Sequence, residues 1–141
     1  MYANYRRYIR SINGASAVEF ALVAPVFLFL IAAVVGYGLM FLTAISLQQL
    51  GADVTRATIG GATQGEKANL ADGLLTSATN EYVLIDNTRV QVDVDYDLGN
   101  EMTVVHLQYD ITGHPIEIFR GILPMPENTF HVRQTISEHA L

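Results

Sequence analysis

The sequence predicts an α+β protein, in which a long N-terminal transmembrane helix extends into a small head with a second helix and a roughly three-stranded antiparallel sheet. Two observations predict this class. The stretch from Phe20 to Leu42 carries no charge, and the stretch from Arg89 onward alternates apolar and polar residues. A membrane-spanning helix needs about 20 apolar residues, whereas strict alternation is typical of a strand with one wet face.

The charges around the apolar stretch predict its orientation. The next charge after Glu19 is Asp53, and a core helix of a soluble protein rarely runs this long without a polar face. Arginines before a first span favour the cytoplasmic side, and they stand here as Arg6, Arg7 and Arg10. From Asp53 onward there are 13 acids and 5 bases, a net charge of −8. We therefore expect the N-terminus inside and the acidic remainder outside.

Composition excludes several classes of function. The outer part has no basic patch that would neutralise phosphates, which argues against a nucleic-acid partner. The chain has no cysteine, so neither disulfides nor a lipidated cysteine can hold it.

The N-terminus allows three kinds of processing. A secretory signal has an apolar core of 7–15 residues followed by a small-residue cleavage site, but here the triplet Ala15-Ser16-Ala17 precedes a longer core. The adjacent arginines Arg6 and Arg7 are a weak twin-arginine export pattern. The third alternative is cleavage between the basic leader and the apolar helix, which keeps the helix.

The stretch G-A-S-A-V-E-F-A-L-V-A-P-V-F, which starts at residue 14, favours this third alternative. It resembles the N-terminus of a type IV prepilin, and within that group the TadE family of minor pseudopilins of the tight-adherence (Flp-type) pilus. The signals are a glycine, an acid five residues later, the adjacent phenylalanine and an early proline: Gly14, Glu19, Phe20 and Pro25. The resemblance covers about Arg10 to Gly60.

The resemblance implies a processed subunit of the bacterial inner membrane. A prepilin peptidase would cut after Gly14, so that Ala15 begins the mature chain. The expected segments are then a cytoplasmic leader (1–14), a transmembrane and extended helix (15–60) and a periplasmic head (61–141). Its implied partners are the peptidase, other pilin and pseudopilin subunits, the inner-membrane Tad assembly platform and the lipid bilayer. The implied processes are pilus assembly, adhesion and biofilm formation, with a place in the pilus or at its base left open.

Cleavage would give Glu19 a partner. The new amino group of Ala15 has a reference pKa near 8, and residues i and i+4 share a helix face. A carboxylate at the membrane edge is costly, so the resemblance implies pairing of Glu19 with the Ala15 amine during assembly, with Phe20 beside it. The alternative is a capping box, in which Ser16 and Glu19 begin the helix. Pro25 predicts a helix kink.

The rest of the chain predicts the head. An apolar stripe (Leu47, Leu50, Val54, Ala57) continues the first helix to Gly60-Gly61. The pair Ala32 and Gly36 has the small-xxx-small spacing of close helix contacts. A second helix is expected from about Glu66 to Thr79, with its apolar face made of Leu70, Ala71, Leu74, Leu75 and Ala78.

Alternation then predicts three strands. Residues 89–110 indicate a hairpin around Leu98-Gly99-Asn100, and residues 130–136 a third strand. The apolar loop between them is either a lid on the core, which we favour slightly, or a contact surface for another subunit; its members are Ile116, Ile118, Phe119, Ile122 and Leu123.

No catalytic or metal motif emerges. Asp93, Asp95 and Asp97 lack the glycine and the acid that a calcium loop requires at residues 98 and 104, and the histidines lack metal-ligand spacing. We therefore expect no enzymatic activity, no cofactor and no metal. The sequence predicts a TadE-like minor pseudopilin with a structural role. The alternative is an uncleaved single-pass membrane protein whose periplasmic head binds a ligand or partner.

Overall fold

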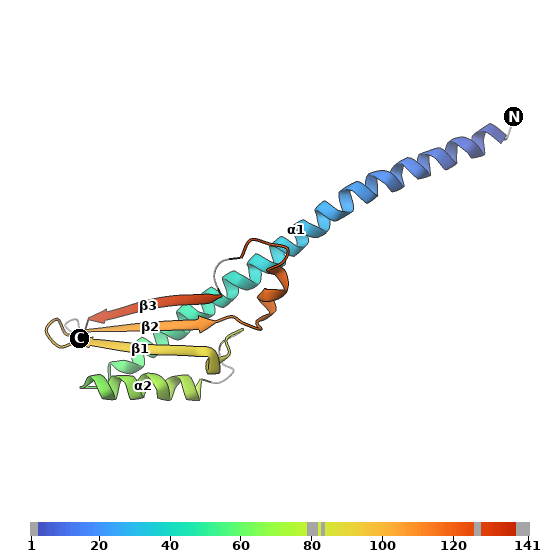
Figure 1. The fold of residues 1–141 in the computed structure, drawn as a ribbon. Helices are drawn as coiled ribbons and strands as arrows, with labels where there is room; N and C mark the ends of the chain where they lie inside the picture. The colour runs from blue at the N-terminus through green and yellow to red at the C-terminus, as the bar shows by residue number, and fades with distance from the viewer. Residues whose placement is uncertain (1–2, 79–81, 83, 126–127, 138–141) are drawn as a thin grey trace.

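The computed structural model describes residues 3–78, 82, 84–125 and 128–137. Figure 1 shows one continuous helix, α1, whose first half stands clear of the head and whose second half packs against it. This confirms the predicted α+β class. The elements are α1 (Ala3–Thr58), α2 (Gln64–Ser77), the 3-10 helix η1 (Asn87–Arg89), β1 (Val90–Asp97), β2 (Met102–Asp110), the 3-10 helix η2 (Pro115–Phe119) and β3 (Thr129–Ser137).

The three strands form an antiparallel sheet in the order β1-β2-β3. Val94 of β1 pairs with Val105 of β2, and Leu107 of β2 pairs with Val132 of β3. Along β1 the valines and Tyr96 are buried or half-buried and the residues between them are exposed. The predicted hairpin and third strand are therefore confirmed, because the alternation reports which face of the sheet is covered.

The core lies between the sheet, the second half of α1 and α2. Leu47, Leu50 and Val54 of α1 are fully buried, as the predicted stripe requires. They meet an inward row from β2: Thr103, Val105, Leu107 and Tyr109. At the outer edge of β1, the Gln64 side chain accepts from the Tyr96 amide and donates to the Val94 carbonyl. This side chain therefore occupies two of the backbone groups that the β1 edge presents for strand pairing.

Helix α2 differs from the prediction at its face and its start. It begins at Gln64, because Thr63 and Glu66 form a capping box. Leu70 was expected on the apolar face but is 40% exposed, and Lys67 is fully buried instead. The Lys67 ammonium donates to the Thr58 carbonyl (3.2 Å) and lies 4.5 Å from the Tyr96 ring centroid. The position next to the carbonyl end of α1 suits a cation.

The loop after β2 is divided between the two roles that its sequence allowed. Ile116 and Leu123 are buried and act as a lid, as expected. Ile118 is 75% exposed and Ile122 is 54% exposed. The same loop packs on α1 at Gly36, where an added Cβ would meet Leu123 Cδ1 at 2.8 Å. Gly36 therefore serves a contact within this chain, rather than the helix–helix contact that its spacing with Ala32 allowed.

Candidate functional site

All residues of the predicted processing and pairing site lie within α1. Gly14, Ala15, Glu19 and Phe20 are exposed, and a Cβ added at Gly14 would meet nothing within 4 Å. In the full chain the helix begins at Ala3, so Ser16 lies within the helix and not at its N-terminus. A capping box at Ser16 applies only to a chain that begins at Ala15. Cleavage after Gly14 and charge pairing of Glu19 stay predictions.

Helix α1 continues through Pro25, and the apolar side chains on either side of this proline are not covered by the rest of the chain. Every large apolar side chain from Val18 to Val35 is exposed. Among the residues that the structure describes, one helix is long and apolar enough to cross a membrane: Gly14–Thr58, with a mean hydropathy of 2.6 in its most apolar window. None of that window is buried by the rest of the chain. The predicted kink at Pro25 stays a prediction.

The bare part of α1 ends where the head begins. Gly36 touches the loop after β2, and the Tyr37 hydroxyl donates to the Pro124 carbonyl (3.2 Å). Sequence reasoning did not single out Tyr37. The sequence does point to this residue, because a tyrosine about one bilayer thickness from Glu19 is typical of a membrane–water boundary.

A second uncovered surface lies on α1 beside the head. Phe41, Leu42 and Ile45 are all exposed, and Gly38 has nothing within 4 Å of an added Cβ. These four residues recur at spacings of three and four and therefore share one face of the helix. We call them the α1 stripe. Sequence reasoning missed it, because the sequence does not tell which of two apolar faces the head covers.

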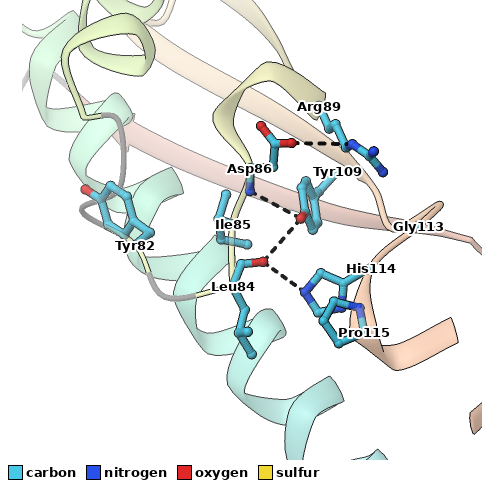
Figure 2. Close-up of a pocket in the computed structure, with 9 residues that line it drawn as sticks. All are labelled: Tyr82, Leu84, Ile85, Asp86, Arg89, Tyr109, Gly113, His114 and Pro115. Carbon is cyan, nitrogen blue, oxygen red and sulfur yellow. Dashed lines mark hydrogen bonds and ion pairs between the residues drawn. The ribbon is translucent and has the colours of Figure 1, made fainter. Parts of the chain in front are cut away.

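The head contains an open pocket between the segment before β1 and the loop after β2 (Figure 2). The Tyr109 hydroxyl donates to the Leu84 carbonyl (3.2 Å) and accepts from the Asp86 amide (3.3 Å). His114 Nε2 bonds the same Leu84 carbonyl (3.0 Å), and its Nδ1 accepts from the Ile116 amide. The histidine is thus the neutral tautomer that donates from Nε2. Leu84 sits in the left-handed region (φ 65°), and these bonds hold it there.

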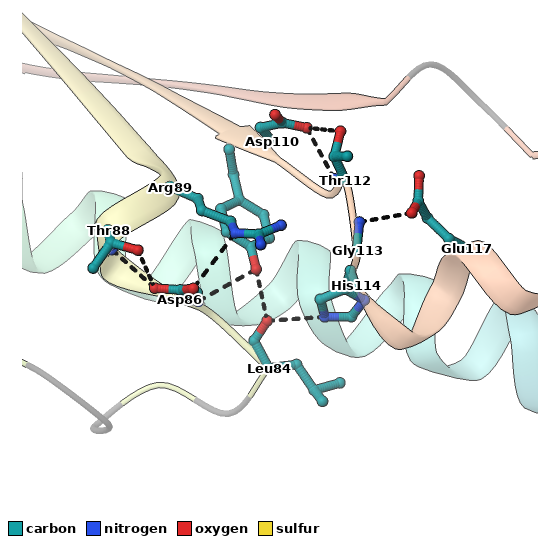
Figure 3. A network of polar contacts seen from close by, with 10 residues as sticks. Leu84, Asp86, Thr88, Arg89, Asp110, Thr112, Gly113, His114 and Glu117 are labelled. Carbon is teal, nitrogen blue, oxygen red and sulfur yellow. Dashed lines mark hydrogen bonds and ion pairs between the residues drawn. The ribbon is translucent and has the colours of Figure 1, made fainter.

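The carboxylates around this pocket accept hydrogen bonds from nearby backbone amides and threonine hydroxyls (Figure 3). Asp86 accepts from the amide and hydroxyl of Thr88 and lies 3.5 Å from Arg89 Nε. Asp110 accepts from the amide and hydroxyl of Thr112. These are local turn bonds. Among these bonds no nucleophile is paired with a base. Together with the bonds of Tyr109 and His114, they hold the segment before β1 against the loop after β2.

The same bonds set the ionisation of the carboxylates. The Thr88 hydroxyl lowers the pKa of Asp86, the Thr112 hydroxyl lowers that of Asp110, and the Asn100 side chain lowers that of Asp97. Burial raises the pKa of the Tyr109 phenol. Each shift therefore favours the state that the group holds at neutral pH, ionised for the three carboxyls and neutral for the phenol.

The acidic row of β1 faces solvent. Asp93, Asp95 and Asp97 are all exposed, and His106 Nε2 lies 3.9 Å from Asp95 Oδ2 across the strand pair. No cluster of three or more potential metal ligands occurs among the described residues.

These features define a class of protein: one helix of membrane-spanning length, uncovered over its first half, that carries a small α+β head. Residues 14–56 match the family model described as TadE-like protein, so the chain is similar to that family over its N-terminal helix. Neither the curated proteins nor the solved structures give a match to the chain. The family match ends within α1, before the remainder of the head.

Proposed function

We propose that the chain is a minor pseudopilin of a Tad/Flp-type pilus. It is inserted in the bacterial inner membrane with its head in the periplasm, is cut after Gly14 by a prepilin peptidase, and works as a structural subunit without catalysis. The observation that carries the proposal is that the family match starts at the predicted cleavage site. The family match begins at residue 14, where the sequence predicts the cut, and it runs to residue 56, so it includes the bare part of α1 and most of the part that packs on the head.

The mechanism is lateral helix association. Removal of the leader creates an amine at Ala15 that is largely cationic at neutral pH, four residues before the exposed Glu19. In a low-dielectric membrane edge, an acid gains most from a partner charge, and a second subunit of the same assembly supplies one. The α1 stripe adds an apolar contact beside the head, where the helix surface remains uncovered.

The first test is the mass of the mature chain. The intact mass and N-terminal peptide of the membrane-extracted protein are measured after expression with and without a prepilin peptidase. We expect a chain that begins at Ala15 only when the peptidase is present. Gly14→Val should abolish the cut, whereas Gly38→Val should leave it unchanged; both glycines have open space around them, so neither variant strains the helix sterically.

The same measurement separates the alternative function. A chain that keeps Met1 with an active peptidase contradicts the proposal and favours a tethered head that binds a partner. If the cut occurs, Glu19→Gln tests assembly. We expect normal cleavage of this variant and a loss of chemical cross-links between subunits.

A further inference from the structure

The segment 115–125, which we call the η2 loop, lies at the end of the head nearest the bare helix (Figure 1). It touches α1 at Gly36 through Leu123, Phe119 and Met125, and the Tyr37 hydroxyl bonds its Pro124 carbonyl. The loop is therefore fixed to α1 at a known height along the helix.

That height matches the far boundary of a bilayer. If Glu19 marks the first boundary, a hydrocarbon core of about 30 Å at 1.5 Å per residue spans roughly 20 residues. The second boundary then falls near Leu39, next to the positions where the η2 loop contacts α1. The turn between β1 and β2, which includes Leu98, lies at the end of the head opposite the η2 loop (Figure 1).

The surface of the η2 loop suits this position. Ile118 and Ile122 are exposed, although Ile116 and Leu123 of the same segment are buried. The chain from Asp53 onward carries a net charge of −8, but the η2 loop holds one acid and one base, Glu117 and Arg120. A neutral apolar surface can approach lipid where the acidic remainder is repelled by it.

We propose that the η2 loop is a membrane-contact surface: Ile118 and Ile122 enter the bilayer interface on the side of the head. This inference rests on the membrane span of the proposed function. Such a contact would fix how the head is rotated about the axis of α1, because it adds a second point of attachment to the membrane beside the helix.

The test uses the absence of cysteine in the chain. Single cysteines are introduced in the full chain by Ile118→Cys, Ile122→Cys, Leu98→Cys or Phe27→Cys and labelled with an environment-sensitive fluorophore. Each variant is placed as one copy per nanodisc of phosphatidylethanolamine and phosphatidylglycerol, with or without spin-labelled lipid. Leu98 is the matched control, because it is 75% exposed, as Ile118 is.

We expect spin-labelled lipid to quench the labels at 118, 122 and 27 several-fold more than the label at 98, and iodide to quench chiefly the label at 98. Quenching at 27 with labels at 118 and 122 that behave like 98 overturns the membrane contact and leaves the span intact. Labels at 118 and 122 that are shielded from iodide but unaffected by spin-labelled lipid also overturn it, because they indicate a protein contact. No lipid quenching at 27 overturns the span itself and the inference with it.

Discussion

The two halves of α1 have similar apolar compositions and different environments. Leu28 is 64% exposed and Leu47 is fully buried, although both lie on the same unbroken helix. The second half meets α2, β2 and β3, whereas in the first half every large apolar side chain from Val18 to Val35 is exposed. The difference teaches that one half stabilises the head, whereas the other stays uncovered and, in the proposed function, is available to lipid and neighbouring subunits.

The largest expected effect comes from the same change in both halves. Leu47→Ala should lower the free energy of unfolding of the head by ~2–5 kcal/mol, because it leaves a cavity in the core. Leu28→Ala should leave it unchanged, because no side chain of the head touches that position. Amide hydrogen exchange of β2 in nanodiscs measures both. Equal losses for the two variants would break the comparison.

A pair of glycines sharpens the boundary between the halves. Gly36→Leu should cost the head ~1–3 kcal/mol, because the new side chain meets Leu123 and Phe119 and forces the η2 loop off the helix. Gly38→Leu points into open space and should cost little. Exchange rates of the amides at 116–123 report the change. Similar rates in the two variants would show that the η2 loop is not packed on Gly36.

A smaller effect is expected at the end of α1. Lys67→Met should cost ~1–2 kcal/mol, because it removes the charge at the Thr58 carbonyl and over the Tyr96 ring while it keeps the buried stem. Arg56→Met is the control, since its ion pair with Asp53 is largely exposed and contributes little. Urea unfolding of the head followed by tyrosine fluorescence compares the two, and a larger loss for Arg56→Met would contradict the assignment.

The smallest effect is a pH dependence confined to the head. The folded pKa values of Asp86, Asp97 and Asp110 lie below the ordinary value of 3.8. Their stabilisation is therefore complete above that value and is lost as the pH falls through the folded pKa values. We expect the urea midpoint to fall below about pH 4. A variant with Asp86→Asn, Asp97→Asn and Asp110→Asn should show a flatter acid limb; an unchanged limb would place the acid sensitivity elsewhere.

The sequence by itself determined the features that depend on local pattern. Period-two alternation located β1, β2 and β3, charge-free length located the membrane-spanning candidate, and residues 14–25 carried the TadE-like resemblance. It also placed Asp93, Asp95 and Asp97 on the wet face of a strand, because alternation reports which residues share a face.

Only the tertiary structure decided which apolar faces the chain covers. Lys67 replaces Leu70 in the core because the carbonyl end of α1 lies beside it, and no periodicity within α2 reports that neighbour. Gly36 is taken by the η2 loop, and Ile118 stays exposed beside buried Ile116, because the loop touches α1 about 80 residues away in sequence. Local pattern tells which residues avoid water, but only the packed chain tells which of them it buries itself and which it leaves for a membrane or a partner.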